Sequence, residues 1–345
     1  MISSDSYRPR ARRPLIGAQV STAGGLQLVV PRALELGAEV VQIFNANPRT
    51  WRSRPFSTEE LHTFSAALRA HRLPLFLHTI YLVNLASPEE ELRLRSEEAL
   101  VEALLLGTRT GAAGVVTHVG SHRGAGFARA RNWVAQAVTR AYVRVAETLG
   151  QTGSQVTGPT ESRTGDPSGS QAIVPPLLLE TAAGSGQTVG GRLEELEDLL
   201  LLLDSALPPG LSPAGLCLDT AHLFAAGYPL HETEPDGLDA LIARLRSLGL
   251  SDRIGLIHLN DSQTPFGGRQ DRHQNLGYGK MGYQTLARVV RHPKLAHVPF
   301  VLEVPGLEGH GPDAFNLGVA KSMREGAPGP PARLVPAEKD PADAG

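Results

Sequence analysis

Residues 215–228, GLCLDTAHLFAAGY, begin with a short apolar run that is bounded by Gly215 and ends at Asp219. Runs of this kind, each followed by an amphipathic stretch, recur along the chain. The eight runs are residues 15–20, 40–44, 74–78, 114–118, 176–180, 215–219, 254–259 and 299–304. Short aliphatic runs bounded by Gly or Pro are typical of strands buried in a parallel sheet. Eight such units predict an α/β fold, a (β/α)8 TIM barrel with its active site at the carboxyl ends of the strands.

The segments between the runs support this fold. Residues 59–70, 128–149, 192–203 and 238–248 carry helical patterns of apolar and polar side chains. A doubly wound open sheet is the structural alternative, because it also alternates strands and helices. The even spacing of the units and the absence of a Gly-rich dinucleotide-binding motif both disfavour the open sheet.

The composition excludes several classes of protein. Hydrophobic residues make up 41% of the 345 and charged residues 20%, which is enough for a large packed core. The 33 Lys and Arg against 35 Asp and Glu give a formal charge of −2, so binding of nucleic acid through bulk positive charge is excluded, although a local positive site is not. The single cysteine, Cys217, excludes a disulfide framework and a cysteine-based zinc cluster. With no apolar run near 18 residues and no signal peptide, we expect a soluble cytoplasmic protein with no membrane partner.

Three stretches differ in composition from a packed domain. We expect residues 1–13 to be a flexible basic tail, residues 151–173 a disordered Gly/Ser/Thr/Pro-rich insertion, and residues 323–345 a disordered Pro/Ala-rich tail. The barrel domain is then residues 14–322.

His, Asp and Glu residues end six consecutive runs. They are His78, His118, Glu180, Asp219, His258 and Glu303. Because the carboxyl ends of barrel strands form one ring, these side chains are expected to converge. Imidazoles and carboxylates without thiolates suit Zn, Mn or Fe, and the pattern does not choose among these metals.

Two further segments add possible ligands to this ring. His222 lies just beyond the run that ends at Asp219, where the turn can direct it over the barrel mouth. Asp271 and His273 lie two residues apart in the segment GGRQDRH (267–273), and side chains at that spacing in an extended segment point the same way. Both could therefore bind one ion.

These motifs, read together, resemble the endonuclease IV family of metal-dependent apurinic/apyrimidinic endonucleases. The resemblance covers residues 14–320. It is carried by IFNANPRTW (43–51), LHTIYLVNLAS (77–87), THVGSH (117–122), LLLETAAGSG (177–186), CLDTAHLFAAGY (217–228), HLNDSQTPFGGRQDRHQNLGYGKMG (258–282) and VLEVPG (301–306). The chain departs from the family pattern at Gln19, Val119 and Thr181, where His, Pro and Asn are usual. Changes beside metal ligands alter metal affinity more readily than the class of reaction.

The resemblance implies a TIM barrel that binds three divalent metal ions, most often Zn2+, with Mn2+ or Fe2+ as alternatives at one site. His78, His118 and a bridging Glu180 are the implied ligands of the first ion. Glu180, Asp219, His258 and Glu303 are those of the second, and His222, Asp271 and His273 those of the third. Three divalent ions outweigh the charge of the four carboxylates, which suits an anionic substrate.

The implied activity is hydrolysis of the phosphodiester bond 5′ to apurinic/apyrimidinic sites in duplex DNA. It leaves a 3′-hydroxyl and a 5′-deoxyribose phosphate, and blocked 3′ termini are also trimmed. Divalent ions would activate a water for attack on phosphorus. We assign Glu180 and Glu303 a catalytic role within the metal site. The implied partner is duplex DNA with abasic sites or blocked 3′ ends, bound by a monomer.

Four residues are expected to contact the DNA. Arg49 and Tyr81 match positions that the family inserts or stacks at the lesion, where a guanidinium plane and a ring can replace lost base stacking. Asn47 and Arg272 are candidates for phosphate contacts. Ordinary packing at the rim of the barrel is the alternative for each of them.

Two other functions remain open at this point. A metal-dependent sugar isomerase or epimerase of the xylose-isomerase-like barrels also has a ring of Glu, Asp and His, but it has no need of His222, Asp271 and His273 together. A metal-free relative that only binds DNA or acts as a scaffold is the other. The intact set of acids argues against it, because clustered unpaired carboxylates are costly without metal.

Overall fold

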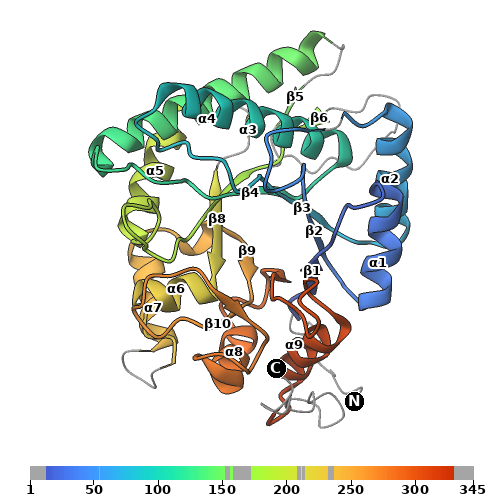
Figure 1. Ribbon diagram of the computed structural model, residues 1–345, viewed down its shortest axis with the longest axis vertical. Helices are drawn as coiled ribbons and strands as arrows, with labels where there is room; N and C mark the ends of the chain where they lie inside the picture. Colours follow the sequence, from blue (N-terminus) through green and yellow to red (C-terminus); the bar gives the residue numbers. More distant parts are fainter. Residues whose placement is uncertain are drawn as a thin grey trace, which may run out of the picture.

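Eight parallel strands close into a barrel in the computed structural model of the chain (Figure 1). The structure describes residues 13–329, except 54, 152–155, 158–171, 208–210, 212–213 and 232–236. The barrel order is β1-β12-β9-β8-β7-β4-β3-β2. The strands are β1 (Ile16–Gln19), β2 (Val41–Phe44), β3 (Leu75–His78), β4 (Gly114–Thr117), β7 (Leu177–Glu180), β8 (Gly215–Asp219), β9 (Ile254–His258) and β12 (Phe300–Leu302). The predicted TIM barrel is confirmed, and the open sheet is excluded.

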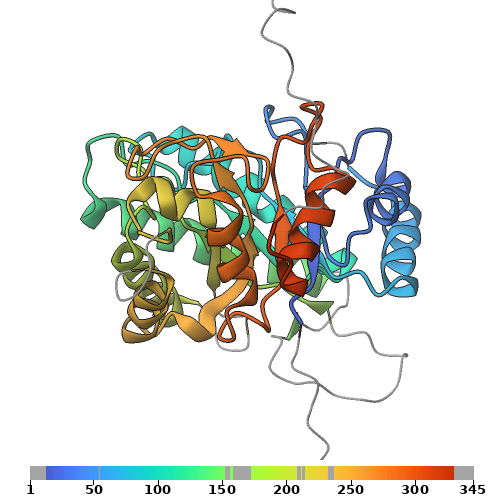
Figure 2. The same cartoon turned by 90° about the horizontal axis from the view of Figure 1, so that it is seen from below.

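Helices surround the strands on the outside, as two views at 90° show (Figures 1 and 2). They are α1 (Val29–Leu36), α2 (Thr58–Ala70), α3 (Glu90–Thr110), α4 (Phe127–Gln151), α5 (Leu193–Ala206), α6 (Thr220–Ala226), α7 (Leu238–Ser247), α8 (Gly282–Arg291) and α9 (Ala314–Glu325), with short 3-10 turns at Leu26–Leu28 and Ser251–Arg253. The four predicted helical segments correspond to α2, α4, α5 and α7 within a few residues. Within the described residues, none of these helices combines the length and apolar character needed to cross a membrane.

Local sequence explains where these helices begin and end. The Ser57 hydroxyl accepts from the backbone N–H of Glu60, and the Glu60 carboxylate accepts from that of Ser57, so α2 begins with a capping box. Helix α1 ends at Gly37, whose φ of 73° is a left-handed conformation that glycine adopts without a steric penalty.

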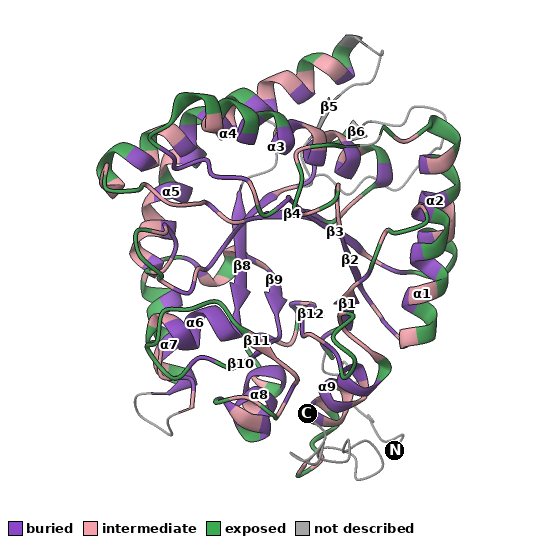
Figure 3. Ribbon diagram, viewed as in Figure 1, coloured by how far each residue is buried: buried purple, intermediate pink, exposed green. Residues whose placement is uncertain are grey.

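The barrel has two apolar layers. The larger layer lies between the strands and the helices, so the helices are buried on their inner faces and exposed outside (Figure 3). A separate cluster is formed by one side chain near each of seven barrel strands: Val40, Phe76, Val116, Leu178, Cys217, Leu256 and Val301. The eighth strand contributes Gly17, where a Cβ would lie 1.7 Å from the Val40 carbonyl oxygen. This cluster fills the barrel interior, as side-chain layers do in this fold.

The packed part of the chain extends beyond the expected boundary at residue 322. Helix α9 runs to Glu325, and Met323 is fully buried. Arg13, expected in the flexible tail, forms an ion pair of 2.8 Å with Glu325. Residues 1–12 and 330–345 lie outside the described residues.

The insertion at 151–173 is also not wholly irregular. Gln151 is the last residue of α4, and β5 (Val156–Thr157) pairs in parallel with β6 (Ala172–Ile173). These few residues have regular structure, and the rest of the insertion is outside the described part of the chain.

Candidate metal centre

Strand geometry brings the predicted metal ligands to one place. In a strand, side chains two residues apart point to the same side of the sheet. Six members of the interior cluster are each followed, two residues later, by one of the residues that end the runs. The pairs are Phe76 and His78, Val116 and His118, Leu178 and Glu180, Cys217 and Asp219, Leu256 and His258, and Val301 and Glu303. Each of the six therefore points inward, one layer above the apolar filling of the barrel.

The first group is formed by His78, His118 and Glu180. Glu180 Oε2 lies 3.0 Å from His78 Nε2 and 3.2 Å from His118 Nε2. His78 Nδ1 donates to the Thr79 carbonyl at 2.6 Å, so the ring presents its other nitrogen, Nε2, to Glu180. Side chains of His78 and Glu180 are buried, whereas His118 is about one third exposed at the mouth.

Glu180 also belongs to a second group with Asp219, His258 and Glu303. His258 Nδ1 lies 2.9 Å from Glu180 Oε1, 3.3 Å from Glu303 Oε2 and 3.9 Å from Asp219 Oδ2. Because the two Glu180 oxygens face different groups, this carboxylate bridges them.

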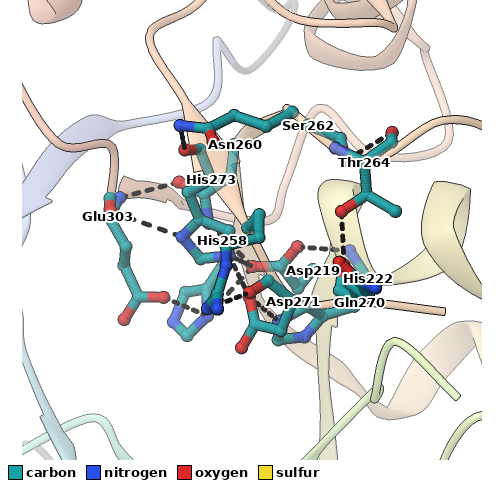
Figure 4. Close-up of polar contacts among 12 residues, drawn as sticks. Asp219, His222, His258, Asn260, Ser262, Thr264, Gln270, Asp271, His273 and Glu303 are labelled. Carbon is teal, nitrogen blue, oxygen red and sulfur yellow. Dashed lines mark hydrogen bonds and ion pairs between the residues drawn. The ribbon is translucent and has the colours of Figure 1, made fainter. Parts of the chain in front are cut away.

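A third group combines His222 from α6 with two residues of the loop that follows β9 (Figure 4). In this loop, β10 (Asp261–Ser262) pairs antiparallel with β11 (His273–Gln274). Asp271 Oδ1 lies 3.1 Å from His222 Nε2 and 3.3 Å from His273 Nε2. Asp219 lies close to this group as well, with Oδ2 at 3.5 Å from His273 Nε2. The structure thus brings together all nine predicted ligands and places Asp219 between the second and third groups.

Carbonyl oxygens hold the second ring nitrogen of four histidines. His222 Nδ1 contacts the Thr181 carbonyl at 2.7 Å, and His273 Nδ1 contacts that of Glu303 at 3.3 Å. His78 is held in the same way, and His258 Nε2 donates to the Gln42 side-chain oxygen at 2.9 Å. Such partners fix the ring orientation and present the other nitrogen as a ligand.

The donor set fits a metal. The Nε2 atoms of His222 and His273 are buried and make no hydrogen bond within the described residues, although Asp271 lies nearby. Burying a ring nitrogen without a partner is costly, and a cation between these atoms and the carboxylate would satisfy both.

The electrostatics of the groups follow from burial and mutual attraction. Burial alone would raise the pKa of Glu180, but the imidazoles of His118 and His258 outweigh it and hold that pKa well below its usual range. Burial lowers the pKa of His118 despite the neighbouring Glu180. For His222, burial is outweighed by Asp219 and Asp271, which raise its pKa. Glu180 is therefore an ionised carboxylate surrounded by imidazoles.

Two buried amides in the site were missed by sequence reasoning. Gln42 Nε2 donates to Glu303 Oε1 at 2.7 Å and to Gln19 Oε1 at 2.8 Å. Asn260 donates to Asp219 Oδ2 at 2.7 Å and accepts from the Glu303 backbone N–H at 2.8 Å. The spacing that places the ligands could have found Gln42, because it lies two residues after Val40 of the interior cluster.

The residues expected to contact DNA lie on exposed loops at the same rim. The Arg49 backbone N–H donates to Asn47 Oδ1 at 3.1 Å, and that of Tyr81 donates to the Pro48 carbonyl at 3.0 Å. Tyr81 is 58% exposed, and its ring centroid lies 6.1 Å from that of His78. Arg272 is exposed between two residues of the third group.

Known proteins are similar to this chain in both sequence and fold. The model of the xylose isomerase-like TIM barrel family matches residues 30–325. A protein of Chloroflexus aggregans named probable endonuclease 4 is 34% identical over 311 residues, which are 90% of this chain and 98% of the relative. The crystal structure of endonuclease IV from Thermus thermophilus superposes with a TM-score of 0.71 at 35% identity, covering 90% of this chain and 99% of that one. A D-tagatose 3-epimerase-like protein has a TM-score of 0.60 at 14% identity and is similar in fold alone.

Proposed function

The chain belongs to the endonuclease IV family of enzymes, and on that premise we propose that it hydrolyses the phosphodiester bond 5′ to apurinic/apyrimidinic sites in duplex DNA. The products are a 3′-hydroxyl and a 5′-deoxyribose phosphate, and blocked 3′ termini are trimmed at the same site. The observation that carries this proposal is the third group, His222, Asp271 and His273, built onto a ring of six strand-end ligands. A sugar isomerase or epimerase has no need of that third group.

Three divalent ions, most often zinc, with manganese or iron as alternatives at one site, are the proposed cofactor. His78, His118 and Glu180 would hold one ion. Glu180, Asp219, His258 and Glu303 would hold another, and His222, Asp271 and His273 a third. Divalent ions bound there supply Lewis acidity, which lowers the pKa of water and stabilises negative charge on a phosphodiester.

The chain itself positions the reacting groups. Glu180 connects two groups through its two oxygens, so the spacing between them is set by one rigid, buried side chain. Glu303 is held from two directions, because Gln42 donates to its carboxylate and Asn260 accepts from its backbone. Preorganised ligands need no rearrangement when the substrate binds, and the activation free energy is lower because that cost is avoided.

Exposed arginines support a DNA partner despite the net charge of −2. Arg49 and Arg52 lie on the loop after β2, and Arg269 and Arg272 lie on the loop after β9. In a parallel barrel these loops share one rim, so the four exposed arginines lie on the same side of the barrel as the mouth and can contact phosphates. Tyr81 stands beside the first group, where its ring can fill the gap that a missing base leaves in the stack.

The direct test is cleavage of a duplex that carries one tetrahydrofuran analogue of an abasic site, with the new ends mapped. This analogue cannot undergo β-elimination, so a nick that leaves a 3′-hydroxyl requires hydrolysis. We expect that nick, and we expect prolonged chelation to remove it. Protein that contains metal but makes no nick would contradict the proposal.

A matched pair of histidine variants separates metal binding from general damage to the loop. His118→Ala removes a member of the first group and should abolish the nick. His122→Ala changes a residue four positions away whose Nδ1 accepts from the backbone N–H of Gly124 and Gly126, and it should leave the nick intact. Equal loss in both variants would indicate a folding defect instead of a lost ligand.

A further inference from the structure

The carboxylate of Asp261 is fully buried and accepts four backbone hydrogen bonds. Its Oδ2 accepts from the N–H groups of Gly277 at 3.0 Å and Gly279 at 2.9 Å. Its Oδ1 accepts from those of Ser262 at 2.8 Å and Met281 at 3.0 Å. Both oxygens are thus occupied by main-chain donors.

These donors lie at the two ends of one loop, residues 262–281. Ser262 begins the loop on β10, and Gly277, Gly279 and Met281 lie where the chain returns before α8. The Lys280 N–H also donates to the Ser262 carbonyl at 2.7 Å, so the two ends are tied together. Asp261 therefore closes the base of the loop.

The same loop carries two of the three members of the third group, Asp271 and His273. Within it, Ser262 pairs with His273, and Asp261 pairs with Gln274. His273 is consequently one register position from the buried carboxylate. Any change in how the ends of the loop meet would shift His273 and Asp271 relative to His222, which is held separately on α6.

The contact between loop and carboxylate is close. A Cβ added at Gly279 would lie 2.3 Å from Asp261 Oδ1, so only glycine allows the backbone to approach this far. An asparagine at 261 would keep one accepting oxygen. Its NH2 group would replace the second oxygen and would then face two backbone N–H donors with nothing to accept from them. A carboxylate, with two accepting oxygens, is therefore required.

We propose that Asp261 is a positioning residue for metal binding at His222, Asp271 and His273. It acts through the backbone of residues 262–281 and touches neither the metal nor the substrate. The inference rests on the proposed function in one respect, that the third group holds an ion.

The test is zinc binding by the full chain, measured without DNA. Metal-free protein is titrated with Zn2+ against a competing chelator, and bound metal is counted by atomic spectrometry. We expect Asp261→Asn to weaken the binding of one ion by about 10–100-fold, the usual effect of removing a group that orients ligands. Binding of the other ions should match that of the wild type, and excess zinc should restore nicking in Asp261→Asn but not in His222→Ala.

Two further variants keep the test decisive. Gly279→Ala crowds the same carboxylate and should give the same selective loss of zinc binding. It serves as the test if Asp261→Asn does not fold. Glu39→Gln is the control, because Glu39 also accepts a backbone N–H, from Ile16 at 2.9 Å, but lies at the opposite end of the barrel. It should leave zinc binding unchanged.

Zinc affinities in Asp261→Asn and Gly279→Ala equal to those of the wild type would overturn the proposal. A wild-type chain that binds no ion at the third group would overturn it together with the metal assignment. A wild-type chain that binds the ions but does not cut the abasic duplex would refute the proposed function while leaving the role of Asp261 intact.

Discussion

Substitution of Gln42 by leucine should weaken metal binding without removing any ligand. Gln42 is fully buried and contacts two members of the second group. It accepts from His258 Nε2 at 2.9 Å and donates to Glu303 Oε1 at 2.7 Å. Leucine has a similar volume, so the packing is kept while these two hydrogen bonds and the one to Gln19 are lost.

The magnitude follows from the bond to the carboxylate. A hydrogen bond to a charged group contributes about 1.5–3 kcal/mol. Because about 1.4 kcal/mol is a tenfold change in an equilibrium constant, the dissociation constant for zinc should rise roughly 10- to 150-fold. This range overlaps the loss of about 10–100-fold that usually follows removal of a group that orients a metal ligand.

The assay is a zinc competition titration of wild type and Gln42→Leu, with thermal unfolding of both. Tyr142→Phe is the matched control. Its hydroxyl is buried and makes two hydrogen bonds at the start of β7, from the Leu177 N–H at 2.9 Å and to the Pro175 carbonyl at 3.1 Å. It should lower stability and leave zinc affinity unchanged. An unchanged zinc affinity in Gln42→Leu would refute the reasoning, because both bonds would then be irrelevant to the ligands.

Three further predictions follow from other parts of the structure. Glu180→Gln should lower the metal content and reduce nicking by at least about a hundredfold with the fold retained, since it weakens two groups at once; metal analysis with circular dichroism checks this, and wild-type turnover would contradict it. Arg49→Ala should raise the dissociation constant for an abasic duplex with metal content unchanged, whereas Arg72→Ala, on the α2–β3 connection at the other end of the barrel, should not; equal affinities in both variants would count against insertion or stacking of Arg49 at the lesion. Burial opposes ionisation of Glu39, but Arg324 and the Ile16 N–H outweigh it and lower its pKa. The carboxylate therefore stabilises the fold at pH values above its ordinary pKa of 4.5, and this contribution is lost as the pH falls through the lower pKa of the folded state. The free energies of unfolding of wild type and Glu39→Gln, measured in urea, should converge at that low pH, and a difference that does not change with pH would refute this prediction.

Much of the fold could be predicted because its signals are local. The eight apolar runs and the four helical patterns reflect the periods of strands and helices, and each appears at the expected place. The end of α9 was predicted less well. Pro and Ala dominate the tail beyond it, whereas the burial of Met323 depends on packing against the barrel.

The candidate ligands could be found for the same reason. A residue at the end of a buried parallel strand must lie at the mouth of the barrel, so His78 or Glu180 can be located without coordinates. Their connections could not be found this way. Gln42 and His258 are 216 residues apart in the chain, and only closure of the barrel brings their side chains within 2.9 Å.

The sequence by itself determined the class of fold, the nine candidate ligands and the family to which the chain belongs, because each is encoded in short segments with a fixed period or motif. Only the tertiary structure decided how those ligands are shared and held. Asp219 lies between two groups, and Asp261 closes the loop that carries His273. These relations depend on hydrogen bonds and contacts between side chains from distant strands, and such distances exist only after the chain has closed on itself.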